Sequence, residues 1–236
     1  MVMETEKMTD TAPTVMPQSS GWALVVDDHP LFCDALELTL KSLQNFSEVQ
    51  TADCLEAALA KLDASNSAPA LILLDLNLPD VNGLDGLIRL KRSASKTPII
   101  IVSSMTDNNI IKGAIAAGSS GFVPKHSARN VFRDAIEQIG AGNIYTPQGF
   151  VEGQEDDEET LAIARLSSLT NQQARILELI CEGKLNKQIA YDLSIAEATV
   201  KAHVTSIMRK LNVQSRTQAV LVAQEAKFSK PLPKET

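Results

Sequence analysis

The stretch ALILLDLNLPDVNG, residues 70–83, begins as a continuous apolar run and turns polar at Asp75. Four further apolar or β-branched runs have the same character as its first half: WALVV (22–26), EVQTA (48–52), TPIIIVS (97–103) and GFV (121–123). Segments of helical periodicity alternate with these runs, at residues 30–43, 53–64, 83–93, 107–117 and 127–139. Apolar strands that alternate with helices are typical of a parallel sheet with both faces covered. The sequence therefore predicts a doubly wound, five-stranded parallel α/β domain over residues 21–145.

Beyond this domain the chain changes character twice. Residues 146–168 contain Gly, Pro and a cluster of acids between Glu152 and Glu159, which is typical of an acidic linker with room for one short helix. Over residues 169–236, apolar residues recur at three- and four-residue spacing without a strand candidate. This spacing predicts a small all-α domain of four helices, at 170–182, 186–193, 197–211 and 215–227. The polar leader, residues 1–20, is expected to be disordered.

The net charge of -7 is unevenly distributed along the chain. Residues 1–145 carry a net charge of -6 and the linker carries -5, whereas residues 169–236 carry +4. A positive domain on an acidic protein favours a polyanionic partner for that domain. An ordinary solvated helix surface would have the same charge, so charge alone leaves both interpretations open.

Neither a membrane segment nor a secretion signal is indicated. No apolar run reaches the roughly 18 residues of a membrane-spanning helix, and the leader lacks a basic start with an apolar core. We therefore expect a cytoplasmic protein that does not bind membranes. Cys33, Cys54 and Cys181 are far apart and lie on apolar helical faces, so we interpret them as buried thiols rather than a disulfide or metal framework.

Three carboxylates are expected at one edge of the predicted sheet. Asp27 and Asp28 follow the first strand, and Asp75 follows the third. Functional groups of such sheets collect outside the carboxyl ends of the strands. Crowded carboxylates repel each other, but Mg²⁺ accepts oxygen ligands from them and from a phosphate, which removes the repulsion. One carboxylate can then attack a phosphoryl group as a nucleophile and become an aspartyl phosphate.

Two further polar side chains follow the remaining strands, Ser103 after the fourth and Lys125 after the fifth. A hydroxyl and an ammonium group at these places are suited to contact a phosphoryl group. Together the motifs VVDDHP (25–30), LLDLNLPDVNG (73–83), IIIVSS (99–104) and GFVPK (121–125) resemble the receiver domain of bacterial response regulators, which has a flavodoxin-like fold.

This resemblance, over roughly residues 22–140, implies a role for each residue that matches the family motifs. Asp75 would be the phosphoacceptor, and a sensor histidine kinase the phosphodonor. The Mg²⁺ ligands would be Asp27, Asp28, Asp75 and the backbone carbonyl of Asn77, and the phosphate partners Ser103 and Lys125. Phe122 occupies the position of the aromatic switch, which in the family turns inward when phosphorylation draws the hydroxyl residue toward the phosphate.

Taken singly, these residues have purely structural alternatives. Asp27 and Asp28 could cap the helix that begins at Pro30, Lys125 could be a solvated lysine, and Phe122 a core ring. Suitable residues at four of the five strand ends favour the phosphorylation pocket over independent coincidence.

The helical domain resembles the effector domain of LuxR-class regulators over about residues 166–228, and its pairing with a receiver resembles the NarL/FixJ subfamily. The runs EG, NKQIA and TVKAHV carry this likeness. The brief connection at 193–197 is typical of a helix-turn-helix, and Thr170 with Gln173 forms a capping-box pattern. Two positions depart from the family pattern. The family usually has an acidic residue where this chain has Gln173, and commonly a basic residue where it has Thr205. These departures put in doubt which operator sequence the domain recognises.

The helix at 197–211 is the candidate recognition helix. Val200, Val204, Ile207 and Leu211 form one apolar face, which must pack on the bundle. The opposite face presents side chains suited to reach base edges in the major groove: Lys201, Ala202, Thr205 and Arg209. Candidates for phosphate contacts are Asn186, Lys187, Thr199, His203, Lys210 and Arg216. The alternative is an ordinary surface helix with scattered cations, and His203 alone fits packing or capping equally well.

The two domains together indicate a transcriptional regulator and not an enzyme. One small helical domain makes few base contacts, so we expect a homodimer on double-stranded DNA, with the last helix as the dimer contact that the family implies. RNA polymerase stays open as a further partner. Two other hypotheses are a receiver that docks partners without phosphorylation, and a phosphatase or nucleotide-binding enzyme. The latter is disfavoured because no strand is followed by a Gly-rich phosphate loop.

Overall fold

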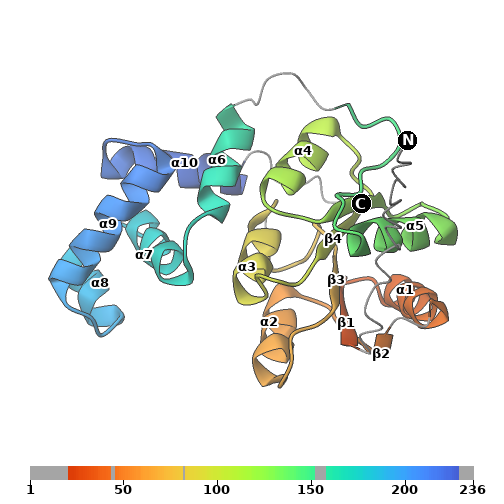
Figure 1. Cartoon of the computed structure of the whole chain (residues 1–236). Coiled ribbons are helices and arrows are strands. Elements are labelled where there is room, and N and C mark those ends of the chain that lie inside the picture. The colour runs from red at the N-terminus through yellow and green to blue at the C-terminus, as the bar shows by residue number, and fades with distance from the viewer. Residues whose placement is uncertain (1–20, 44–45, 82, 152–157, 229–236) are drawn as a thin grey trace, which may run out of the picture.

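The computed structural model describes residues 21–43, 46–81, 83–151 and 158–228 of the 236-residue chain. These residues form two lobes, a sheet flanked by helices and an all-helical lobe (Figure 1). The leader that we expected to be disordered, residues 1–20, lies outside the described residues, as do the acids at 152–157. Among the described helices, none has the length and apolar character needed to cross a bilayer.

The first lobe, the sheet domain, has a five-stranded parallel sheet in the order β2-β1-β3-β4-β5. The strands are β1 (Gly21–Val26), β2 (Phe46–Ala52), β3 (Leu71–Leu74), β4 (Ile99–Ser103) and β5 (Gly121–Pro124). The helices are α1 (Pro30–Ser42), α2 (Leu55–Ala64), α3 (Asp85–Ser93), α4 (Asn108–Ala116) and α5 (Arg129–Gly140). The predicted doubly wound fold is confirmed.

Alternation along the strands divides the core into two layers. Ala23 and Val25 of β1 point to the layer that holds the apolar faces of α1 and α5, with Leu36 and Phe132 among its buried residues. Leu24 and Val26 point to the opposite layer, under α2, α3 and α4. Because both faces are covered, β1, β3, β4 and β5 consist almost wholly of buried residues, most of them apolar, whereas the edge strand β2 is buried only at Ala52.

A short extended segment after α5 pairs with β5. Tyr145 bridges Gly121 in parallel orientation, with hydrogen bonds from the backbone N–H of Phe122 to the carbonyl of Tyr145 (2.9 Å) and from the N–H of Tyr145 to the carbonyl of Ser120 (3.1 Å). The chain therefore leaves the sheet domain from alongside its last strand.

The second lobe, the helical domain, contains α7 (Asn171–Cys181), α8 (Asn186–Asp192), α9 (Glu197–Leu211) and α10 (Arg216–Phe228). These are the four helices that the sequence predicts. The capping box is also present: the hydroxyl of Thr170 accepts from the N–H of Gln173, whose side chain accepts from the N–H of Thr170.

The short helix for which the sequence left room in the linker is α6 (Glu158–Ser167). It packs against α4 of the sheet domain and against α9 and α10 of the helical domain (Figure 1). Ile163 of α6 faces Gly113 of α4, where a Cβ atom would lie only 3.2 Å from the Ile163 side chain. Nη2 of Arg92 on α3 donates to the carbonyl of Leu166 at 2.9 Å. The two lobes are thus connected by packing as well as by the chain.

The expectation of three buried thiols is wrong. Cys33 is buried, Cys54 is half-buried and Cys181 is exposed, and none of the three is in a disulfide. Cys181 is the last residue of α7, and it lines a pocket between α3, α7 and α10, although Leu179 and Ile180 just before it are buried. Cys54 is the N-cap residue of α2 and Cys181 is the last residue of α7, so both lie at helix ends and not within a buried helical face.

Candidate functional site

The strand register brings four of the predicted side chains to one edge of the sheet. Val26 lies opposite Leu74, so Asp27 and Asp75, the next residues on each strand, lie side by side. Ser103 lies opposite Pro124, so Lys125 follows directly beside it. Hydrogen bonds from the N–H of Asp75 to the carbonyl of Val26 and from the N–H of Lys125 to that of Ser103, both 2.9 Å, continue this register into the loops.

Lys125 connects two buried carboxylates. Its Nζ lies 2.8 Å from Oδ2 of Asp27 and 2.8 Å from Oδ2 of Asp75. Burial alone would lower the pKa of Lys125, but the hydrogen bonds and charges of the two carboxylates outweigh burial and raise the pKa. The ammonium group is therefore charged, and it compensates part of the negative charge of the pocket.

One carboxylate oxygen of Asp75 is buried without a hydrogen-bond donor among the described residues. Its side chain is buried, and burial raises the pKa of its carboxyl group, while the hydrogen bond from Lys125 opposes part of that rise. Among the described residues, none donates a hydrogen bond to Oδ1 of Asp75, although this atom is buried. Since unpaired buried oxygens are costly, this atom is suited to accept a cation or a bond to a substrate atom.

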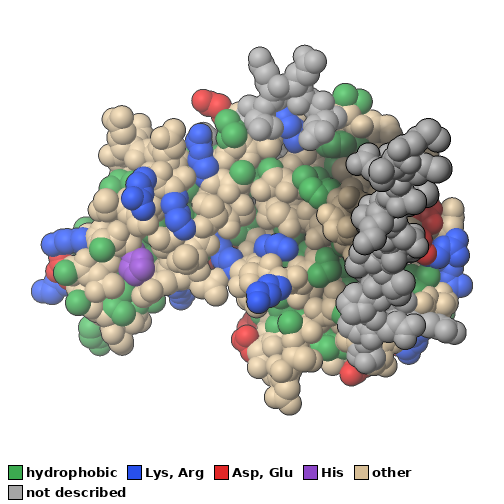
Figure 2. Space-filling model, viewed as in Figure 1, with side chains coloured by type: hydrophobic (Ala, Val, Ile, Leu, Met, Phe, Trp, Pro, Cys, Tyr) green, Lys and Arg blue, Asp and Glu red, His purple; other side chains and the backbone are tan. Residues whose placement is uncertain are grey.

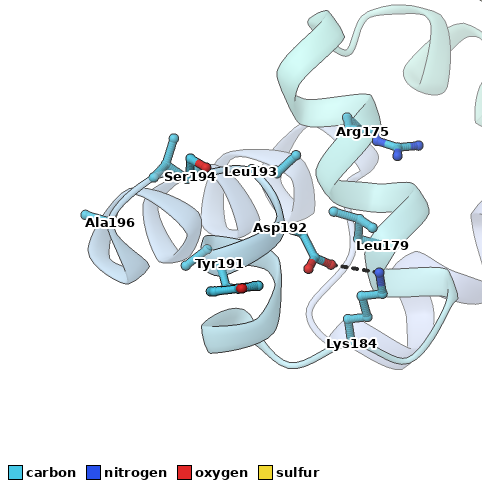
Figure 3. Close-up of a pocket in the computed structure, with 10 residues that line it drawn as sticks. Arg175, Leu179, Lys184, Tyr191, Asp192, Leu193, Ser194 and Ala196 are labelled. Atoms are coloured by element: carbon cyan, nitrogen blue, oxygen red, sulfur yellow. Dashed lines mark hydrogen bonds and ion pairs between the residues drawn. The ribbon is translucent and has the colours of Figure 1, made fainter.

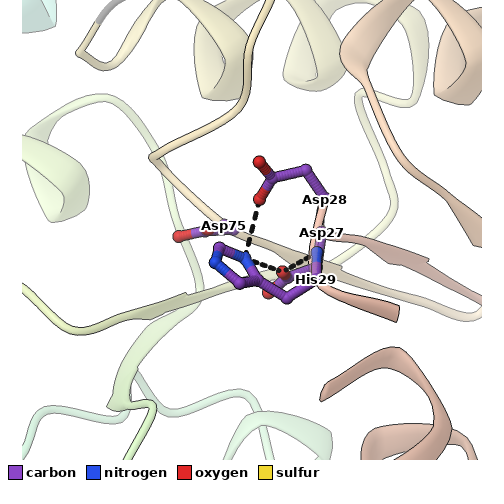
Figure 4. Close-up of side chains that lie close together, drawn as sticks. All are labelled: Asp27, Asp28, His29 and Asp75. Carbon is purple, nitrogen blue, oxygen red and sulfur yellow. Dashed lines mark hydrogen bonds and ion pairs between the residues drawn. The ribbon is translucent and has the colours of Figure 1, made fainter. Parts of the chain in front are cut away.

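The acids form a group with the geometry of a cation site. Ligand atoms of Asp27, Asp28, His29 and Asp75 all lie within 4.8 Å of one another (Figure 4). Carboxylate oxygens are the ligands that Mg²⁺ prefers, and Asn77 lies on the same rim of the pocket. The donor set and the unpaired oxygen of Asp75 therefore fit a hard divalent cation.

The pocket beside these acids has a volume of about 420 Å³. Its lining includes Asp75, Asn77, Ser103 and Lys125, which the sequence predicted. Ser103 is buried, and its hydroxyl accepts a hydrogen bond from the N–H of Met105 at 3.2 Å. An anionic group of phosphoryl size could therefore contact a carboxylate, a hydroxyl and an ammonium group together.

Three residues of the site were missed by the sequence argument. Nδ1 of His29 lies 2.8 Å from Oδ1 of Asp28 and 3.1 Å from Oδ1 of Asp27, as Figure 4 shows. Lys125 lies over the ring of Phe32, with Nζ 5.0 Å from its centroid. The thiol of Cys33 donates to the carbonyl of Asp27, and burial, with the charge of Asp27, raises its pKa to about 11. The position of His29 directly after two acids was the available signal.

Phe122 is fully buried in the layer under α2, α3 and α4. Its ring therefore has the inward position, and its backbone N–H is the donor to Tyr145 in the segment that leads toward α6. The residue at the predicted switch position is thus bonded directly to the chain that connects the two lobes.

In the helical domain, α8 and α9 meet at a tight turn. Ser194 in this turn has a φ of 52°, in the left-handed region. A wide pocket of about 900 Å³ lies between α7 and the turn (Figure 3), and the ion pair of Lys184 with Asp192, 2.7 Å long, crosses it. This arrangement of a short helix, a tight turn and a longer helix is that of a helix-turn-helix.

The apolar and polar faces of α9 agree with the prediction. Val200, Ile207 and Leu211 are fully buried, and Val204 is half-buried. All the predicted base-reading residues are exposed: Lys201, Ala202, Thr205 and Arg209. Lysine and arginine side chains are spread over this lobe in Figure 2. The exposed face of α9 is therefore accessible to a partner.

The predicted phosphate contacts divide into accessible and internally bonded residues. Lys187 and Thr199 are exposed, and His203 is half-buried. Nζ of Lys210 donates to the carbonyl of Ser168 (2.8 Å) and to Oε1 of Gln173 (2.9 Å). Arg216 donates to Oδ1 of Asn186 and to the carbonyl of Lys184, so three of the six candidates also hold the domain together.

Comparison with protein families gives two matches on this chain. The family described as the response regulator receiver domain matches residues 23–137. The family described as bacterial regulatory proteins, luxR family, matches residues 167–223. The matches fall on the sheet domain and on the helical domain respectively.

Two relatives are similar to this chain over most of their own length and over both of its lobes. The glycerol metabolism activator of Pseudomonas putida is 42% identical over 213 residues, which cover 87% of this chain and 96% of the relative. The nitrate/nitrite response regulator protein NarP of Escherichia coli (strain K12) is 34% identical over 217 residues, 88% of this chain and 96% of the relative. RcsB from Salmonella enterica serovar Typhimurium, in a promoter complex, has the same fold with a TM-score of 0.51 at 20% identity, over 87% of this chain and 98% of that chain.

Proposed function

Because this chain belongs to the response regulators that join a receiver domain to a LuxR-type DNA-binding domain, we propose that phosphorylation of Asp75 controls its dimerisation and its sequence-specific binding to DNA. The phosphodonor is a sensor histidine kinase, and the regulated process is transcription. The observation that carries the proposal is the pairing of Lys125 with Asp75 and Asp27 at 2.8 Å, beside a buried oxygen of Asp75 that has no donor among the described residues.

The proposed domain limits are 21–145 for the receiver, 146–168 for the linker and 169–236 for the DNA-binding domain. The relatives described above are an activator and a response regulator, which favours a regulatory role over an enzymatic one. A cytoplasmic location and RNA polymerase as a further partner stay predictions.

In the proposed phosphoryl transfer, a carboxylate oxygen of Asp75 attacks the phosphorus of a phosphohistidine on the kinase. The new O–P bond forms as the P–N bond breaks, and the electron pair of that bond returns to the imidazole nitrogen. Lys125 holds a positive charge 2.8 Å from the acceptor carboxylate, where the phosphoryl oxygens gather. Ser103, at the end of β4 beside Lys125, supplies a hydroxyl to the same pocket lining.

Asp27, Asp28, Asp75 and the backbone carbonyl of Asn77 are the residues that would hold Mg²⁺. When bound, this ion neutralises charge shared between the carboxylates and the phosphoryl oxygens. The unpaired oxygen of Asp75 and the close group of carboxylates support this assignment.

The output is binding of duplex DNA by two copies of the helical domain. Lys201, Ala202, Thr205 and Arg209 would read bases from the exposed face of α9, and Lys187 and Thr199 would contact phosphates. Asn186, His203, Lys210 and Arg216 stay candidates for phosphate contacts. The contacts between α6, α4 and α10 support a route by which a change at the receiver reaches the DNA-binding domain.

The first experiment tests the phosphoacceptor. The intact chain is incubated with a small acyl phosphate and Mg²⁺, and its mass is measured. We expect the wild type to gain one phosphoryl group, Asp75→Asn to gain none, and the control Asp53→Asn to behave as the wild type, because Asp53 is an exposed acid after β2 outside the group of ligands. Equal uptake by Asp75→Asn with retained circular dichroism would refute the assignment.

The second experiment tests control of DNA binding. Duplexes selected from a random pool are titrated with the chain, with and without beryllofluoride, and the oligomeric state is followed by sedimentation. We expect beryllofluoride to increase dimerisation and affinity for the wild type and to have no effect on Asp75→Asn. Equal affinity in all cases would instead favour a receiver that docks partners without phosphorylation.

A further inference from the structure

The loop that follows the proposed phosphoacceptor is attached to a helix far from it in the sequence. Oδ1 of Asp80 accepts a hydrogen bond from the N–H of Leu55 at 3.0 Å, and Oδ2 accepts one from the N–H of Glu56 at 2.9 Å. Leu55 and Glu56 are the first two residues of α2. A single carboxylate in the β3–α3 loop thus binds the N-terminus of a helix 25 residues earlier in the chain.

Helix α2 has only a weak cap of its own. Its N-cap residue is Cys54, whose Sγ accepts from the N–H of Ala57 at 3.4 Å. The first N–H groups of a helix have no partners within the helix, and negative charge is favoured at that end. Sulfur is a weak acceptor, so Asp80 supplies the strong acceptor that α2 otherwise lacks.

The attachment point lies at the far end of the segment that carries the predicted metal carbonyl. Asn77 lies two positions after Asp75, and Asp80 lies three positions after Asn77. Both Asp75 and Asn77 line the pocket. Leu76 and Leu78 are buried and fix the inner side of the loop. On the outer side Pro79 and Asp80 are exposed, so the hydrogen bonds of Asp80 restrain a part of the loop that packing does not hold.

We propose that Asp80 is a positioning residue for the cation site: its hydrogen bonds to α2 hold the loop so that the Asn77 carbonyl faces the carboxylates of Asp27 and Asp75. This proposal rests on the proposed function of the pocket. Asp80 itself is not expected to touch the cation or the phosphoryl group.

The experiment separates positioning from simple stabilisation of α2. The variant Asp80→Ala removes the attachment, and the double variant Asp80→Ala with Cys54→Asp supplies a cap from the N-cap position of α2 without restoring the attachment. Mg²⁺ binding to each full-length protein is measured by calorimetry, unfolding by circular dichroism, and phosphoryl uptake from a small acyl phosphate by mass. Asp63→Ala, which removes an exposed acid from the last turn of the same helix, is the control.

We expect Asp80→Ala to lower the unfolding temperature and to raise the dissociation constant for Mg²⁺ by about tenfold, the lower end of the effect of removing residues that orient metal ligands. The double variant should recover the unfolding temperature but not the Mg²⁺ affinity. Unchanged Mg²⁺ affinity in Asp80→Ala, or its recovery in the double variant, would overturn the proposal. If the wild type binds Mg²⁺ but takes up no phosphoryl group, the proposed function fails while the positioning role is still decided by Mg²⁺ affinity.

Discussion

At the scale of single residues, Ser194 has a backbone conformation that favours glycine. Its φ of 52° lies in the left-handed region, where a Cβ atom is strained. We expect Ser194→Gly to raise the free energy of unfolding of the helical domain by about 1 kcal/mol, the scale of relief from such strain. Ser194→Ala, which keeps a Cβ, should give no such gain. The unfolding of the helical domain should be followed by circular dichroism, because Trp22, the only tryptophan of the chain, lies in the sheet domain and its fluorescence does not report on the helical domain.

Lys125 is a residue whose removal should strongly destabilise the sheet domain. Lys125→Met leaves Asp27 and Asp75 buried without their shared cation, and loss of one partner of a buried ion pair costs about 3 kcal/mol. We expect a loss of this size in urea unfolding followed by Trp22 fluorescence without divalent ions, and partial recovery at saturating Mg²⁺.

The matched control is Lys41→Met, which removes the exposed ion pair with Glu37 on α1 and should cost less than about 0.5 kcal/mol. If the two substitutions lowered the free energy of unfolding equally, or if Mg²⁺ did not raise that of Lys125→Met, Lys125 would not be compensating the charges of Asp27 and Asp75.

The site residues that could be predicted are those marked by the sequence directly around them. Asp27, Asp75, Ser103 and Lys125 each follow or end an apolar run, and the regular register of a parallel sheet is sufficient to bring them together. The contacts that were missed depend on approach between distant segments. No pattern near Asp80 indicates that it caps α2, and no pattern near Lys210 indicates that its ammonium group bonds to Ser168 and Gln173.

At the scale of elements, the sequence left room for one short helix in the linker, which is α6, but it indicated neither the bounds of this helix nor its packing partners. An amphipathic helix within an acidic stretch has little to distinguish it from a linker. Its partner surface on α4 is made by Gly113, whose lack of a side chain lets Ile163 approach. The contact thus depends on two residues that are 50 positions apart in the sequence. Neither residue indicates the contact by itself, because they meet only in the folded chain.

This contact can be weakened from either side. At Gly113 even a Cβ atom would lie 3.0 Å from the Leu84 side chain and 3.2 Å from the Ile163 side chain, so Gly113→Leu would force these side chains apart. Ile163→Ala would remove apolar area from the same contact. We expect both variants to increase the radius of gyration in small-angle scattering of the full chain, with Ile163→Val close to the wild type. A wild-type radius for Ile163→Ala would show that α6 does not hold the lobes together in solution.

At the scale of the whole molecule, the charge is divided between an acidic receiver and a basic DNA-binding domain. The affinity for DNA should therefore fall steeply with salt, because each phosphate contact releases condensed counterions. Residues that are free to reach phosphates should contribute to this dependence, whereas residues engaged inside the domain should contribute less.

Lys187 and Lys210 separate these two cases. Lys187→Ala removes an exposed cation and should reduce the slope of log affinity against log salt by about one for each copy bound. Lys210→Met removes internal hydrogen bonds and should chiefly lower the unfolding temperature. Lys96→Ala, an exposed lysine of the receiver, is the control and should leave the slope unchanged. The opposite ranking of Lys187 and Lys210 would show that Lys210 leaves its internal partners when DNA binds.

The pairing of Tyr145 with β5 has a consequence for anyone who isolates the receiver. Truncation after residue 140 would uncover the N–H of Phe122 and the C=O of Ser120 at the outer edge of β5, and unpaired edge groups of this kind favour pairing with another chain. Truncation after residue 151 would keep them shielded. The shorter fragment should therefore precipitate or self-associate at concentrations where the longer one stays monodisperse in light scattering, although the two differ by no residue of the phosphorylation pocket.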